Sequence, residues 1–77
     1  MSYRIRPPNT GLHKGKLFTQ LLIPDPEIHI DGVDVVVVKF EDGWWIVPDD
    51  DDESFEDMGP FPTPEAAYVS MKLGHRS

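Results

Sequence analysis

Short runs of apolar residues are separated along the chain by clusters of turn-forming residues, and the clearest apolar run lies in the middle of the chain. Residues 33–40 (VDVVVVKF) contain four consecutive valines. Such a β-branched run favours a strand, and its lack of alternation indicates that both strand faces are at least partly covered. Residues 41–43 (Glu-Asp-Gly) then predict a hairpin turn, and residues 44–48 (WWIVP) predict the returning strand.

The turn can close in two ways, which differ in the tryptophan that shares a face with Phe40. A two-residue turn over residues 42–43 places Trp45 on that face. A three-residue turn with Gly43 in the left-handed region places Trp44 there instead. We favour the three-residue turn, because Glu-Asp-Gly suits a type I turn followed by a glycine bulge.

Weaker patterns precede this hairpin. Residues 16–23 (KLFTQLLI) predict a strand, and we expect Pro24 and Pro26 to end it because neither can continue a ladder. Residues 27–32 (EIHIDG) predict a short strand that runs into an Asp-Gly turn. Residues 1–15 contain adjacent prolines and an Asn-Thr-Gly cluster, so we expect them to be irregular or flexible.

A helix is predicted at the C-terminal end. Thr63 suits the N-cap, Pro64 the first helical position and Glu65 the first turn, and Gly74 suits the stop after Leu73. The apolar stripe expected along this helix consists of Ala66, Val69 and Leu73, with Tyr68 and Met71 beside it. The pattern therefore predicts an α+β fold: a small antiparallel sheet of about three strands, with one C-terminal helix packed on one face.

The composition restricts how such a fold is stabilised. With 77 residues the chain has room for a single small domain, residues 1–77, with a small core. It has no cysteine, which excludes disulfides and fits a reducing cytoplasm. No apolar run is long enough for a secretory signal or a membrane span, so we expect no membrane association. A homodimer would complete a marginal core economically, and both monomer and homodimer stay open.

Charge is distributed unevenly around the formal net value of −7. Residues 1–24 carry four cations and no carboxylate, whereas residues 25–57 carry thirteen carboxylates and one lysine. The densest part is an acidic loop at residues 49–57 (DDDDESFED), which we expect to be solvated and pinned by Phe55. Three interpretations of this loop stay open: a solubilising loop, a recognition surface for a basic partner, or a weak cation site.

Residues 59–66 (GPFPTPEA) carry the one resemblance in the chain. With the aromatic strand before them, they resemble the strand–turn–helix half of many small uncharacterised bacterial and phage proteins, in which a G-P-F-x-T segment enters a helix. Here Glu65 and Ala66 come one residue early. Functionally unrelated groups share this arrangement, including the DNA-binding domains of some integrases, so the resemblance implies a fold and no function.

Patterns typical of catalysis or metal binding are weak. His13, His29 and His75 are scattered without a motif, and no serine lies in a G-x-S-x-G elbow. An EF-hand starting at Asp49 fails, because serine and proline occupy the positions that need glycine and glutamate. His29 and Asp31 supply only two zinc ligands, which is not a site. We therefore expect no enzyme activity, no metal and no cofactor.

Two hypotheses for function remain. The leading one is a non-enzymatic protein that recognises a basic protein partner, with inhibition by mimicry of DNA phosphates as one form of it. The two tryptophans are included in the expected binding surface because adjacent strand residues point to opposite faces, so that one of the pair is expected to be partly exposed. The expected partner-binding residues are Asp49, Asp50, Asp51, Asp52, Glu53, Trp44 and Trp45.

The alternative is a weak nucleic-acid-binding module that uses a basic N-terminal arm. Because the chain as a whole is acidic, nucleic acid is the less favoured partner. The arm consists of Arg4, Arg6, Lys14 and Lys16.

Overall fold

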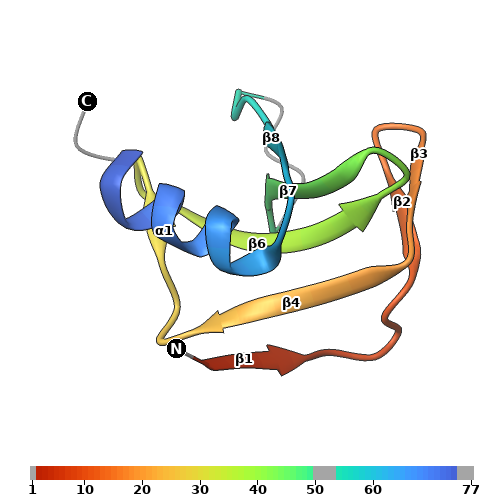
Figure 1. Cartoon of the computed structure of the whole chain (residues 1–77), viewed down its shortest axis with the longest axis horizontal. Helices are drawn as coiled ribbons and strands as arrows, with labels where there is room; N and C mark the ends of the chain where they lie inside the picture. The colour runs from red at the N-terminus through yellow and green to blue at the C-terminus, as the bar shows by residue number, and fades with distance from the viewer. Residues whose placement is uncertain (1, 50–53, 75–77) are drawn as a thin grey trace.

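The computed structural model describes residues 2–49 and 54–74, apart from the side chain of Ser2. These residues form eight strands and one helix (Figure 1). The elements are β1 (Ser2–Ile5), β2 (Gly11–His13), β3 (Lys16–Phe18), β4 (Gln20–Asp25), β5 (His29–Ile30), β6 (Val33–Phe40), β7 (Gly43–Pro48), β8 (Met58–Phe61) and α1 (Pro64–Gly74).

Six strands form one antiparallel sheet in the order β1-β4-β6-β7-β8, with the short β5 also paired to β6. The remaining two, β2 and β3, form a separate hairpin. Its turn uses Lys14 and Gly15, both with positive φ, and Asp31 and Gly32 play the same part between β5 and β6. The predicted α+β class and the Asp-Gly turn are confirmed.

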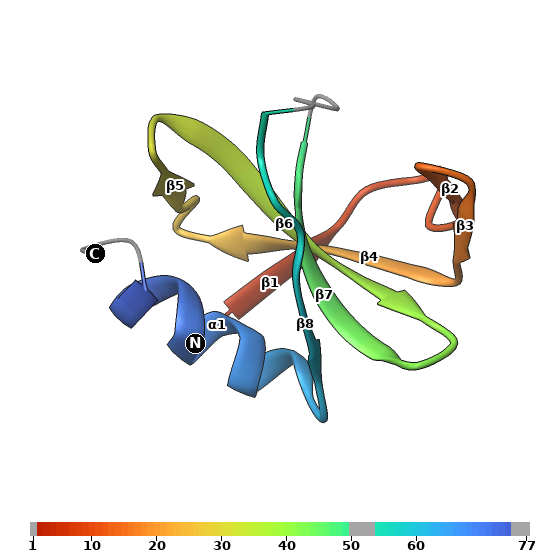
Figure 2. The ribbon, with the colours of Figure 1, turned by 90° about the horizontal axis from the view of Figure 1, so that it is seen from above.

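The sheet is covered on both faces by different elements. Figure 2 shows α1 and the β2–β3 hairpin on opposite sides of the molecule. On the helix side, Val35, Val37 and Ile46 pack with Tyr68 and Met71. On the hairpin side the buried residues are Phe18, Leu21, Val36, Val38, Phe40 and Val47. The prediction that both faces of the valine strand are covered is therefore confirmed.

The prediction of about three strands is wrong, because the main sheet has six. Part of the difference lies in residues 1–15, where we expected irregular structure: β1 joins the main sheet, and β2 belongs to the separate hairpin. Pro7 and Pro8 fall between the two strands, at exposed positions, and so interrupt neither ladder. Tyr3 fixes β1 in place, since its hydroxyl donates a hydrogen bond of 2.7 Å to the carbonyl oxygen of Pro64.

The strand expected at residues 16–23 divides between two layers. Residues 16–18 form β3 of the hairpin, and β4 continues the main sheet as far as Asp25. The strand ends within Pro24-Asp25-Pro26 as expected, at Asp25, but the expectation that Pro24 cannot continue a ladder is wrong. Pro24 pairs with Tyr3 of β1 alone, because β6 pairs with β4 only up to Leu22, and the missing N–H of the proline therefore breaks no second ladder.

The β6–β7 turn closes in neither of the two predicted ways. Phe40 pairs with Gly43 across a two-residue turn of Glu41 and Asp42. Our preferred closure is therefore wrong, and Trp45, not Trp44, lies on the face of Phe40, their ring centroids 6.1 Å apart.

The helix begins as predicted and buries a different stripe. Thr63 caps it, since its hydroxyl oxygen accepts a 3.1 Å hydrogen bond from the amide of Ala66. The face turned to the sheet carries Ala67, Tyr68 and Met71. Val69 and Leu73, which we placed in the apolar stripe, are 48% and 62% exposed. Both faces of the helix carry apolar residues, and the face with Tyr68 and Met71 is the one that packs on the sheet.

Candidate functional site

The acidic loop is described at its two ends. Asp49 follows β7, and its amide donates a 2.9 Å hydrogen bond to the carbonyl oxygen of Asp34. At the other end Phe55 is buried in the helix-side core, which confirms that this residue pins the loop. The predicted partner-binding residues Asp50, Asp51, Asp52 and Glu53 lie outside the described residues.

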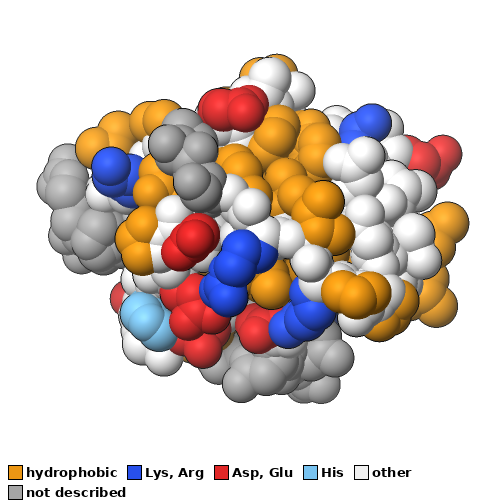
Figure 3. All heavy atoms as spheres, turned by 90° about the horizontal axis from the view of Figure 1, so that it is seen from below, with side chains coloured by type: hydrophobic (Ala, Val, Ile, Leu, Met, Phe, Trp, Pro, Cys, Tyr) orange, Lys and Arg blue, Asp and Glu red, His pale blue; other side chains and the backbone are white. Residues whose placement is uncertain are grey.

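The basic arm is paired with carboxylates of the same chain. Arg4 contacts Glu27 at 3.1 Å, and Arg6 donates two hydrogen bonds to Asp49, at 2.8 and 3.4 Å. The hydrogen bonds to Asp49 raise the pKa of Arg6. Figure 3 shows the face that carries β1, where basic and acidic side chains lie directly beside one another.

The two lysines of the arm are also occupied. The Nζ of Lys14 lies 3.8 Å from Asp57, and that of Lys16 lies 4.6 Å from the ring centre of Trp45 and 5.3 Å from that of Phe40. The second is a cation–π arrangement, which stabilises an ammonium group over an aromatic face. The four residues of the predicted arm thus each contact a different partner, and together they form no continuous positive surface.

A buried polar pair beneath the hairpin escaped the sequence analysis. The Nε2 of His13 lies 3.0 Å from Oδ2 of Asp57, with the two side chains 5% and 15% exposed. The imidazole also stacks on Phe40, with ring centroids 6.4 Å apart. A separation of 44 residues and the absence of any motif leave no sequence signal for this pair. It ties the hairpin to the chain just before β8.

The two tryptophans are each half-buried on a different face of β7. Trp45 faces the hairpin side, and its indole N–H donates a 2.9 Å hydrogen bond to Asp42. Trp44 lies on the helix side, next to the core, and stands opposite Phe61 of β8. Along a strand the five residue-to-residue steps from Trp44 to Asp49 span about 17 Å. The structure therefore places Trp44 near the hairpin tip and the acidic loop at the far end of β7.

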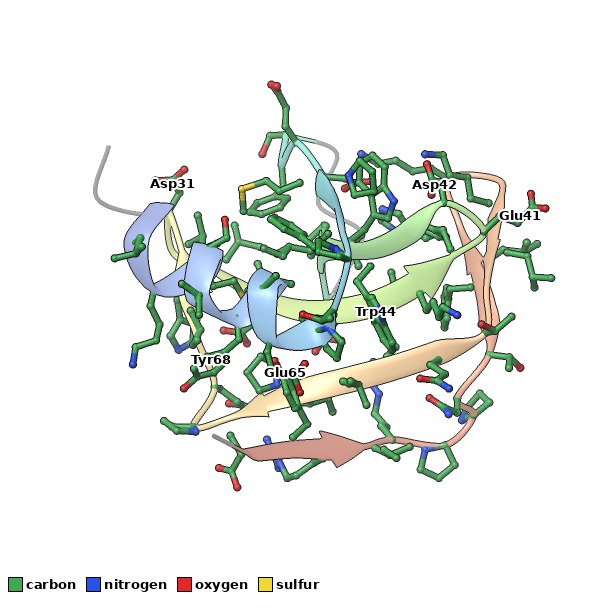
Figure 4. All side chains as sticks on the ribbon, in the orientation of Figure 1. Asp31, Glu41, Asp42, Trp44, Glu65 and Tyr68 are labelled. Carbon is green, nitrogen blue, oxygen red and sulfur yellow. The ribbon has the colours of Figure 1, made fainter. Side chains whose placement is uncertain are left out.

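Several exposed carboxylates form no ion pair with any other described residue. Glu41 and Asp42 form the tip of the β6–β7 hairpin, beside Trp44, whereas Asp31 lies at the tip of the β5–β6 turn (Figure 4). Glu56 and Glu65 are also exposed. Among the described cations only Lys39 has neither an ion pair nor an aromatic partner. Among the described residues, the side-chain charges that form no ion pair are therefore mainly negative.

Metal-ligating side chains do not gather into a candidate site in residues 2–49 and 54–74. Within these ranges no three His, Asp or Glu residues are grouped so that they could hold a metal ion. His29 contacts Asp34, its partner across the β5–β6 ladder, while Asp31 belongs to the turn. His29, weighed above with Asp31 as a zinc ligand, is thus paired with Asp34 of β6.

Comparisons with protein families, curated proteins and solved structures find no match to this chain. The resemblance of residues 59–66 to bacterial and phage proteins stays a prediction. Within the described ranges, no helix is both long enough and apolar enough to cross a lipid bilayer.

Proposed function

We propose that this chain is a non-enzymatic binding protein that recognises a basic protein partner through its acidic loop and its aromatic β6–β7 hairpin. One observation carries the proposal. The arginines and lysines of the N-terminal arm are engaged within the molecule, while Glu41 and Asp42 at the tip of the β6–β7 hairpin form no ion pair with a described residue. A partner therefore meets free negative charge, and the loop at residues 49–57 adds more to it.

Such a surface favours encounter with a basic protein. Long-range attraction between opposite charges raises association rates and fixes the orientation of docking. Aromatic side chains next to the charges supply the buried contact area that typically dominates affinity. Inhibition of a DNA-binding enzyme by mimicry of phosphates is one form that this function can take.

Nucleic-acid binding through the N-terminal arm is the second candidate, and the geometry supports it less. A phosphate that binds Arg4 or Arg6 must compete with Glu27 or Asp49. Because affinity for nucleic acid depends on cations free to replace condensed counterions, this competition weakens the interaction.

Fluorescence anisotropy at low salt separates the two candidates. The probes are a labelled eight-residue lysine peptide and a labelled 20-base-pair DNA duplex. We expect weak binding of the lysine peptide that disappears as salt is raised, and no binding of the duplex at the same protein concentration. Tighter binding of the duplex would overturn the proposal and support the alternative.

A further inference from the structure

Part of the helix-side face of the sheet extends beyond the cover of α1. The register places Lys39, Trp44 and Phe61 side by side on β6, β7 and β8. Two residues further along the strands, Val37 and Ile46 are completely buried. Trp44 and Phe61 are only half-buried, so the sheet ends in an aromatic row that the helix leaves open.

This row forms the floor of a shallow hollow of about 490 Å³. Pro60 and Pro62 flank the aromatic residues, and Glu41 and Asp42 of the hairpin tip form one edge. Gly43 permits the close approach of β8, because a Cβ atom there would lie 3.0 Å from the carbonyl oxygen of Phe61 and 3.1 Å from Cβ of Pro60. The hollow thus combines flat apolar surface with two carboxylates, which are the groups labelled at the tip in Figure 4.

The edge of the sheet beside the hollow is a poor template for an added strand. Pro60 has no N–H to donate, and the β7–β8 ladder is irregular between Trp44 and Ile46. An occupant of the hollow must therefore bind through side-chain surfaces. A polyproline II segment suits this requirement, since it has no internal hydrogen bonds and docks on aromatic-lined grooves with little loss of conformational entropy.

We propose that the hollow binds an extended, proline-containing segment of the basic partner, with prolines on Trp44 and Phe61 and an arginine or lysine at Glu41 and Asp42. This inference rests on the proposed function, whose partner it describes in more detail. Lys39 belongs to the same row and has no ion pair among the described residues. Because it repels a second cation, the segment carries its basic residue at one end only.

The test is an NMR titration of the whole ¹⁵N-labelled chain with three eight-residue peptides. The first has one arginine followed by seven prolines, the second replaces the arginine by glutamate, and the third keeps the arginine before glycine and serine residues. We expect the first peptide to shift the Gly43 amide and the Trp44 indole signals. The other two should bind at least about 5-fold more weakly, the loss of one favourable contact of about 1 kcal/mol.

Two variants locate the binding. Glu41→Gln should weaken binding of the first peptide about 3- to 10-fold, as should Pro62→Ala. Asp25→Asn removes an equal charge from a distant exposed position and should leave the affinity unchanged. An unchanged affinity in both Glu41→Gln and Pro62→Ala would overturn the assignment of the hollow.

Failure of this inference differs from failure of the proposed function. Equal binding of the glycine–serine peptide, or no shift at Trp44, would overturn the proline segment. Binding of the lysine peptide described above is measured separately and would still support a basic partner. Loss of binding to every basic peptide would overturn both.

Discussion

Arg6 and Asp49, 43 residues apart, are joined by hydrogen bonds of 2.8 and 3.4 Å. The pair links the basic N-terminal arm to the first residue of the acidic loop. Each of these segments was a separate candidate for binding, and here each neutralises part of the other. The balance that remains is negative, which is why we favour a basic partner.

A double-mutant cycle on this pair should show a small coupling. Both side chains are partly exposed, at 48% and 33%, so solvent screens their attraction. We expect Arg6→Gln and Asp49→Asn to couple by less than about 1 kcal/mol in the free energy of unfolding, decreasing with salt. Urea denaturation at two salt concentrations measures this. A coupling above about 2 kcal/mol that does not respond to salt would contradict an exposed pair.

The His13–Asp57 pair should matter far more for stability. His13→Leu leaves the Asp57 carboxylate under the hairpin with Lys14, at 3.8 Å, as its one ion-pair partner among the described residues. We expect a loss of about 3 kcal/mol in the free energy of unfolding, measured by urea denaturation. The double variant His13→Leu, Asp57→Leu should recover part of this loss, because no unpaired charge remains buried. A loss below about 1 kcal/mol in His13→Leu would show that the pair is dispensable.

Alkaline pH should destabilise the fold through Tyr3. Burial, with smaller effects of Glu65 and Tyr68, raises the pKa of Tyr3 from 10.0 to about 12. A raised pKa stabilises the fold fully below pH 10, and this stabilisation is lost as the pH rises through 12. Tyr3→Phe should cost about 1 kcal/mol at pH 7, because the hydrogen bond to Pro64 is removed.

The difference between wild type and Tyr3→Phe isolates this effect. Between pH 9 and 12 the urea midpoint of the wild type should fall more steeply than that of the variant. Parallel midpoints over this range would show that ionisation of Tyr3 is not linked to unfolding.

Gly59 should tolerate no side chain. A Cβ atom there would lie 2.7 Å from the ring of Trp45 and 2.9 Å from the carbonyl oxygen of Trp44. We expect Gly59→Ala to cost about 2 to 3 kcal/mol. Gly15→Ala is the matched control, since its φ of +83° is unfavourable for alanine but no atom lies within 4 Å. It should cost about 1 kcal/mol, and an equal cost in both variants would contradict the close approach.

Local patterns were sufficient to predict the central part of the fold. The valine run, the Asp-Gly turn and the Thr63 cap each depend on neighbouring residues, and the structure contains all three. What the sequence could not supply depends on contacts between distant residues. The strand β1 is held by its pairing with β4, in which Tyr3 lies opposite Pro24, and by the hydrogen bond from Tyr3 to Pro64. Which face of α1 is buried depends on the side chains that pack with Ile46.

The candidate site was predictable only in part. The hairpin and its two tryptophans were predicted from the sequence. Which face of the sheet each tryptophan lies on depends on the register of the turn, and Glu41, Asp42 and Gly43 are compatible with several registers. The row formed with Phe61 could not be foreseen, because it requires the β7–β8 pairing. The pairing of Arg6 with Asp49 likewise leaves no local signal.

The most direct test of the acidic-surface account is a pull-down from an extract of the cells that make this protein, at low and high salt. The bait is wild type, a variant with Asp50, Asp51 and Asp52 changed to asparagine, or a control with Asp25→Asn, Asp31→Asn and Glu65→Gln. Both variants lose three charges, so only their position differs. We predict a basic protein that wild type and control retain at low salt, that the loop variant loses, and that high salt releases. Equal retention by all three baits, or retention unaffected by salt, would contradict recognition through the acidic loop.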